Sequence, residues 1–173
     1  MTGVTIRVDD EAVLAALGGL AEATADLAPV LEGIGEVLQR STKDRIEQEV
    51  DPAGNPWVRL NPIYAKTKKG PGILRESKQL WGTIVYEVAG DEVTVGTNRP
   101  HARVHQFGAT IVPKTAAALV FQMGGETFHL KSVRIPARPF LGISATDRER
   151  ILDTIADALD AAVGGALTGG AEP

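Results

Sequence analysis

The stretch TIVYEVAGDEVTVGT, Thr83 to Thr97, decides the fold class of this 173-residue chain. Apolar and polar residues alternate on both sides of Gly90-Asp91, which predicts two antiparallel strands joined by a tight turn. Downstream, ALVFQM and ETFHLKSVRI show strand-like patterns on either side of Gly124-Gly125 and predict a second hairpin. The middle of the chain is therefore expected to be antiparallel β-structure.

Helical periodicity flanks this β region on both sides. A first amphipathic helix is expected after Asp9-Asp10 and a second after Asp26, because carboxylates suit the start of a helix. A third is expected in TDRERILDTIADALDAAV, capped by Thr146 or Asp147. Helices at the ends and strands between them indicate an α+β fold, in which an antiparallel β-sheet built from hairpins packs against the N-terminal helices and the C-terminal helix.

The distribution of glycine, proline and other turn residues between the patterned segments suggests a single α+β domain over residues 1–163. It is expected to open with a short strand at Val4–Val8, where apolar and polar residues alternate. The proline-rich segment DPAGNPWVRLNP cannot continue a helix, and Trp57 and Leu60 are expected to pin it to the body. An exposed loop is predicted around 61–76, a protruding hairpin around 114–133 and a flexible, glycine-rich tail at 164–173.

Composition excludes several classes of function. A net charge of -4 does not indicate a general attraction to nucleic acid or to anionic membranes. The absence of cysteine rules out disulfides, thiolate nucleophiles and cysteine-ligated zinc. No secretory signal opens the chain, and no apolar run approaches the roughly 20 residues that span a bilayer, so a soluble protein made in the cytosol is expected.

His101 and His105 stand four residues apart in HARVHQFG and raise the question of a metal site. The segment lacks the acid that follows the first histidine of a zinc-protease helix, and His129 is the only further histidine. No GxSxG elbow, GxGxxG or P-loop pattern occurs either. We therefore predict no catalytic, metal or cofactor-binding residues and interpret the pair as part of a short helical turn, with a metal-dependent hydrolase as the remote alternative.

The basic residues Lys66, Lys68 and Lys69 could contact phosphate without reading a base sequence. A solvated loop explains them more simply, and a nucleic-acid-binding protein that also uses Arg75 is the alternative. Four large aromatic side chains have two open interpretations, as core anchors or as parts of an oligomer interface: Trp57, Trp81, Phe107 and Phe140.

Several short motifs follow one another in a characteristic order: DPxGxPWxxL at 51–60, LxxSxxL at 74–80, VGTN at 95–98, HQFG at 105–108 and PARPFLGIS at 136–144. With the final amphipathic helix, this order resembles the virion morphogenesis family of tailed bacteriophages, the Mu-like group that includes tail completion proteins. The resemblance covers about residues 30–163, and the pairing of HQFG with PARPFLG is its most specific part. Lys78-Gln79, where members often have Thr-Gly, and the hairpin ALVFQMGGETFHL leave the subgroup open.

The resemblance implies a structural protein of the phage neck or tail end, with no enzymatic activity and no cofactor. Such a protein is made in the host cytoplasm and ends up in the virion. It is expected to bind itself, commonly in a sixfold ring, and to dock to tail-tube or terminator proteins and to head-connector proteins, so that a filled head can join the tail. Any contact with DNA would be non-specific, and no membrane partner is expected.

The motifs also supply the candidate structural and interface residues. Pro136 and Pro139 fix an extended backbone, so Arg138 and Phe140 should point in defined directions. Phe140 is expected to point inward beneath the last helix, and Arg138 to reach a carboxylate of its own sheet or of the next subunit. The full set is Trp57, Trp81, His105, Gln106, Phe107, Gly108, Pro136, Arg138, Pro139 and Phe140.

Overall fold

The hairpin predicted at 83–97 is confirmed in the computed structural model, which describes residues 4–5, 10–23 and 26–168. Strand β2 (Val85–Ala89) pairs antiparallel with β3 (Glu92–Thr97), and Gly90 adopts a φ of 63° in the turn. A positive φ costs glycine little, because it has no Cβ. Strand β1 (Val4–Thr5) pairs with the other side of β3, so the sheet has the order β1-β3-β2. The rest of the strand predicted at 4–8 lies outside the described residues.

The first two helices start where the acidic caps predict. α1 (Glu11–Ala23) follows Asp10, whose Oδ1 accepts hydrogen bonds from the backbone N–H groups of Ala12 and Val13. α2 (Ala28–Gln48) follows Asp26, whose Oδ1 accepts from the N–H of Ala28. These bonds satisfy backbone donors that have no partner inside the helix.

The C-terminal helix α6 (Ala145–Thr168) differs from its prediction at both ends. Its start is capped by Ser144, so the cap predicted at Thr146 or Asp147 is wrong. Ser144 Oγ accepts from the N–H of Asp147, and Asp147 Oδ2 accepts from the N–H of Ser144, which is a capping box. The helix continues to Thr168, past the point where the glycines predict a flexible tail, and residues 169–173 lie outside the described part.

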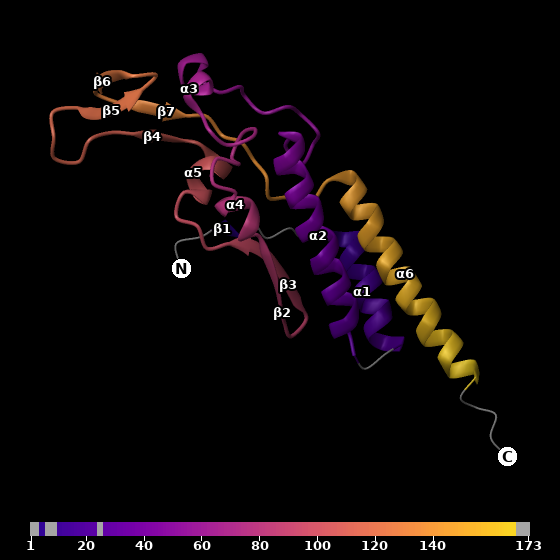
Figure 1. The fold of residues 1–173 in the computed structure, drawn as a ribbon. Helices are drawn as coiled ribbons and strands as arrows, with labels where there is room; N and C mark the ends of the chain where they lie inside the picture. Colours follow the sequence, from indigo (N-terminus) through magenta and orange to yellow (C-terminus); the bar gives the residue numbers. More distant parts are fainter. Residues whose placement is uncertain (1–3, 6–9, 24–25, 169–173) are drawn as a thin grey trace.

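The helices form one layer, and the three-stranded sheet lies against it. α1 and α2 both pack on α6, and α2 also packs on β2 and β3 (Figure 1). Gly35 makes the last contact close, because a Cβ there would collide with the ring of Tyr86 on β2. The apolar cluster between the helices consists of Leu20, Val30, Ile34, Ile151 and Ile155.

A second apolar cluster lies where the C-terminal half of α2 meets the sheet and the connecting segments. Besides Ile46 of α2 and Leu80 of the short helix α4 (Gln79–Gly82), it includes residues from four connections. Its buried members are Val4, Ile46, Trp57, Ile73, Leu80, Ile84, Ala102, Phe140 and Leu141, and Leu60 packs against it.

The remaining strands form a slender extension that we call the arm, residues 109–135. β4 (Ala109–Ile111) pairs with β7 (Val133–Ile135), and β5 (Leu119–Met123) pairs with β6 (Glu126–Leu130), each pair antiparallel and two-stranded. The predicted second hairpin across Gly124-Gly125 is thus confirmed. Figure 1 shows the arm pointing away from the helices. The α+β class is confirmed, with the strands divided among three small sheets.

The segment predicted as an exposed loop around 61–76 contains a short helix, α3 (Pro62–Thr67), none of whose residues is buried. Asn61 caps it by accepting from the N–H groups of Ile63 and Tyr64, and Pro62 occupies its first turn. Both signals are visible in the sequence as Asn-Pro. α3 contacts β5 and lies close to Gly124 in the turn of the second hairpin.

Candidate functional site

The arm is joined to α6 by residues 136–142, PARPFLG, which we call the strap. Gln106 in the short helix α5 (Ala102–Phe107) holds it through three hydrogen bonds of 3.0 Å. Its Nε2 donates to the carbonyl of Leu141, and its Oε1 accepts from the N–H groups of Phe140 and Leu141. The Gln106 side chain is buried, so these bonds are shielded from water. The motifs HQFG and PARPFLG therefore meet directly in space.

Trp57 and Arg138 join the strap to a second motif segment, DPAGNPWVRL. Trp57 Nε1 donates to the carbonyl of Pro139 at 2.9 Å. Arg138 Nε donates to the carbonyl of Val58 at 3.0 Å, and its Nη2 donates to that of Arg59 at 3.4 Å. The irregular segment has no sheet partner here, so the guanidinium satisfies its carbonyls.

The prediction that Arg138 reaches a carboxylate of its own sheet is therefore wrong. Its hydrogen bonds go to backbone carbonyls, and among the described residues no carboxylate bonds to it. Burial lowers the pKa of the Arg138 guanidinium, and the nearby Glu49 charge opposes this shift. Arg138 therefore acts through position and hydrogen bonding, with Glu49 supplying a longer-range attraction.

The backbone conformation and close contacts of Gly108 explain why the motif HQFG ends in glycine. It has a φ of 72°, and a Cβ there would lie 2.9 Å from the backbone nitrogen of Ala137 and 3.0 Å from the carbonyl oxygen of Ile135. The two ends of the arm therefore cross at Gly108 with backbone against backbone. The backbone N–H of Arg138 also donates to the carbonyl of His105 at 2.7 Å. We call this crossing of residues 105–108 with residues 135–138 the root of the arm.

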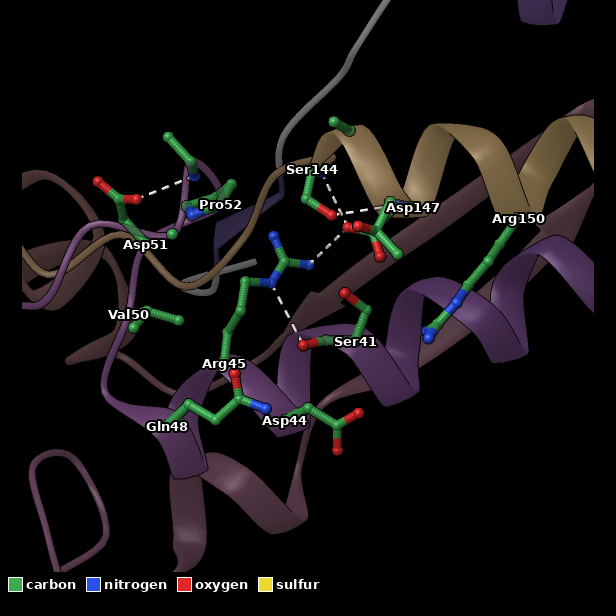
Figure 2. A pocket seen from close by; sticks show the side chains of 14 residues that line it. Ser41, Asp44, Arg45, Gln48, Val50, Asp51, Pro52, Ser144, Asp147 and Arg150 are labelled. Atoms are coloured by element: carbon green, nitrogen blue, oxygen red, sulfur yellow. Dashed lines mark hydrogen bonds and ion pairs between the residues drawn. The ribbon is translucent and has the colours of Figure 1, made fainter.

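Arg45 fixes the far end of the strap to the helices. It donates through Nη1 to the carbonyl of Gly142 at 2.8 Å, and its Nη2 lies 3.4 Å from Asp147 Oδ2. Burial lowers the pKa of Arg45, while Asp147 and Asp44 oppose the shift. Figure 2 shows this ion pair in the wall of an open pocket of about 380 Å³, between α2, the turn at 50–54 and the start of α6. The two charges are bonded to each other, so they brace the fold at this place.

The four large aromatic side chains fall into different environments. Trp57 and Phe140 are buried core anchors, and Trp81 is partly buried beneath the ammonium of Lys43, which lies 5.4 Å from the ring centroid. Phe140 points inward as predicted, but its cluster contains no residue of α6, so the expected position beneath the last helix is wrong. Phe107 is 59% exposed and remains an interface candidate at the root of the arm.

His105 lies in α5 and His101 is the N-cap residue at its start, with the two ring centroids 5.7 Å apart, edge to face. Burial, followed by the charges of His101 and Arg138, lowers the pKa of His105 to about 4. Its Nδ1 is buried without a hydrogen-bond partner in the structure. Over the described residues, no group of three or more histidines and carboxylates is arranged to hold a metal ion. His105 is therefore neutral near pH 7 and packs as an uncharged ring.

This shifted histidine predicts a pH dependence of stability. The unfolded chain protonates His105 near pH 6.5, whereas the folded protein resists protonation until about pH 4. Stability should therefore fall as the pH drops through this window and level off below it, by about 1–2 kcal/mol for a partly solvated ring. Urea unfolding at several pH values measures the effect. A His105→Gln variant should lack this component, and an unchanged pH profile in that variant would contradict the assignment.

The three lysines proposed as phosphate contacts are not equivalent. The ammonium of Lys68 lies 2.7 Å from Glu76 Oε2 and donates to the carbonyl of Gly70, and its side chain is only 6% exposed. Lys66 and Lys69 are exposed. Lys68 therefore holds its own loop together, and the other two remain available to a partner.

The arm itself has no covering layer in the structure. No residue from 109 to 137 is buried, although the rings of Phe121 and Phe128 stack with centroids 5.7 Å apart. A two-stranded hairpin is marginally stable alone in water, so such an arm gains from a partner. Its most exposed apolar residues are Ile111, Val112, Val120 and Leu130. None of these four residues was among the predicted interface candidates. Adjacent apolar residues such as Val120-Phe121, which face opposite sides of a strand, were the available signal in the sequence.

Comparison with known proteins now identifies the family. The profile of the phage virion morphogenesis family matches residues 8–160. The chain belongs to this family. It is 31% identical over 145 residues to "Mu-like prophage FluMu G protein 2" of Haemophilus influenzae, covering 84% of this chain and 87% of the relative. It is 24% identical over 168 residues to "Putative capsid assembly protein G" of Escherichia phage Mu, covering 92% and 96%. No solved structure is significantly similar.

Membership makes the chain a phage virion morphogenesis protein, of a family whose members are typically structural and non-enzymatic. Within the described residues, no helix is long and apolar enough to cross a membrane. Three of the motifs that carry the family resemblance meet at the root of the arm: DPxGxPWxxL, HQFG and PARPFLGIS. These three motifs therefore hold the arm in place.

Proposed function

We propose that the chain is a structural virion protein of the tail completion or neck class, which assembles with itself at the tail end, as a ring, and allows a filled head to join the tail. The observation that carries the proposal is the arm, none of whose residues is buried, on a root fixed by Gln106, Arg138 and Trp57. A firmly held, uncovered arm is suited to binding another protein subunit.

A ring follows if each subunit offers one face to the neighbour ahead and a different face to the neighbour behind. The remaining surfaces would then contact tail-tube or terminator proteins on one side and head-connector proteins on the other. Non-specific contact with DNA through exposed Lys66 and Lys69 is compatible with this place in the particle.

Deleting the gene in the phage or prophage that encodes it tests the proposal. Electron microscopy of the lysate should show filled heads and complete tails that remain unjoined. Missing or malformed heads would instead point to capsid assembly, the role for which the phage Mu relative is named. That outcome would overturn the assignment to tail completion.

A shortened arm tests the part that carries the proposal. Because Ile111 pairs with Val133, replacing residues 112–132 by Asn-Gly should close β4 and β7 with a tight turn. The variant should keep its circular dichroism spectrum and unfold at a stability within about 1 kcal/mol of the parent, because the removed residues are not buried. It should nevertheless fail to restore head–tail joining to the deletion strain. Full restoration would show that the arm is dispensable.

A further inference from the structure

The two ends of the molecule carry opposite charge. Residues 10–48 and 145–162, which include all of α1 and α2 and most of α6, hold thirteen acidic and five basic side chains. Residues 49–144, with the arm and its root, hold twelve basic and seven acidic side chains. Figure 1 shows the arm at one end of an elongated molecule, and the long helices α1 and α6 extending to the other end. Identical copies would therefore attract one another head to tail.

The acidic end has one ordered feature, a row of exposed carboxylates on α6. Spacings of four, four and three residues place them on one side of the helix. Like charges at these spacings repel each other. Among the described residues none of the four forms an ion pair, so a cationic partner would relieve this repulsion. The row, called the acidic face below, is Glu149, Asp153, Asp157 and Asp160.

The arm has the complementary composition. Its cations Lys114, Lys131 and Arg134 are all exposed, and Glu126 is its single acid. Ile111, Val120 and Leu130 lie among them and are 40–60% exposed. The arm therefore offers positive charge together with apolar surface, a combination suited to a protein interface.

The lengths of the two surfaces are also similar. From Glu149 to Asp160 an α-helix rises about 16 Å, at about 1.5 Å per residue. The five-residue strands β5 and β6 each span about 13 Å, in four steps of about 3.3 Å. The hairpin laid along α6 would cover most of the acidic face, and the cations Lys114, Lys131 and Arg134 lie beyond the open end of the hairpin.

We propose that the arm of one copy binds along the acidic face of α6 in a second copy. Each copy then gives its arm to one neighbour and receives the arm of another, which is a heterologous interface. This inference rests on the proposed function and specifies its self-assembly contact. Such contacts close into a ring when the rotation between neighbours is a whole fraction of a turn.

Charge reversal tests the pairing in the deletion strain, with plaque titre and joined particles as readouts. Lys131→Glu with Arg134→Glu, and separately Asp153→Lys with Asp157→Lys, should each lower the yield of joined particles about tenfold or more. A chain carrying all four changes should recover most of the yield, because the charges again match. The control is Glu87→Lys with Glu92→Lys on the exposed β2–β3 hairpin, which should retain normal yield. Circular dichroism and thermal unfolding of each purified variant check that the chain is folded.

The outcomes distinguish the arm–α6 pairing from the proposed function. If the arm variant and the α6 variant both lower the yield of joined particles and the chain with all four changes does not recover it, the proposed pairing is overturned. Loss with the arm variant alone shows that the arm binds a different protein and also overturns it. Normal joining in the strain that lacks the gene would instead contradict the proposed function itself.

Cysteine cross-linking gives an independent measurement, because the natural chain has no cysteine. Particles complemented by two chains, one with Lys131→Cys and the other with Asp157→Cys, should form disulfide-linked dimers on mild oxidation. Pairing Lys131→Cys with Glu92→Cys is the matched control. Equal dimer yields from the two pairs would overturn the proposed contact.

Discussion

The Phe140→Ala variant is expected to lose about 3–5 kcal/mol of unfolding free energy, a large part of the stability of a typical domain. Phe140 is 0% exposed and packs in the cluster that contains Trp57 and Ile46. Truncation removes the apolar surface of the ring and leaves a cavity that the strap cannot fill, because Gln106 fixes the backbone of Phe140 itself. Urea unfolding followed by circular dichroism measures the loss.

Phe107→Ala is the matched control, since it removes the same side chain from a site that is 59% exposed. Its unfolding free energy should change by no more than about 0.5 kcal/mol. Similar losses in the two variants would contradict the division between core anchor and exposed interface candidate. A stable Phe107→Ala chain that fails to join heads to tails would place the exposed ring in a contact with another subunit.

The second large effect is expected for Gln106→Ala, at about 3 kcal/mol. The substitution leaves two N–H groups and one carbonyl of the strap without their partner, and each buried unpaired group costs about 1–3 kcal/mol. Rearrangement and entering water will recover part of the sum. Gln122→Ala, on the exposed face of β5, should change stability by less than about 0.5 kcal/mol.

Hydrogen exchange makes the Gln106 prediction more specific. The amides of Phe140 and Leu141 should exchange faster in Gln106→Ala than in the parent, by more than the global loss of stability explains. Unchanged exchange at these two amides would show that other contacts hold the strap, and that Gln106 is not its main support.

The strands and most helix starts were predictable because their signals are local. Alternation across Gly90-Asp91 and the acids before α1 and α2 each act within a few residues. The short helix α3 was not predicted, although Asn61 and Pro62 are typical of a helix start. The segment Gly70-Pro71-Gly72 that follows favoured a loop instead. The cap of α6 was misplaced by two or three residues, since Ser144, Thr146 and Asp147 are all good caps and only the hydrogen bonds distinguish them.

The root of the arm required the folded structure. Gln106 and the strap are 34 and 35 residues apart in the chain, so their three bonds leave no local pattern. The order of the motifs identified HQFG and PARPFLG as related segments, but it did not show which residues bond to each other. The sequence also gives Phe107 no direction, and its exposure on α5 is visible only in the folded structure.

The way the strap is held has a mechanical consequence. It runs between the arm and α6. Side chains from α2, α5 and Trp57 bond its backbone, and its own Arg138 donates to the carbonyl of Val58. Tension applied to the arm would therefore be shared among these bonds before it reached α6. Stretching the arm would require several of them to rupture together, so a particle joined through it could bear a pull that a flexible tether would not resist.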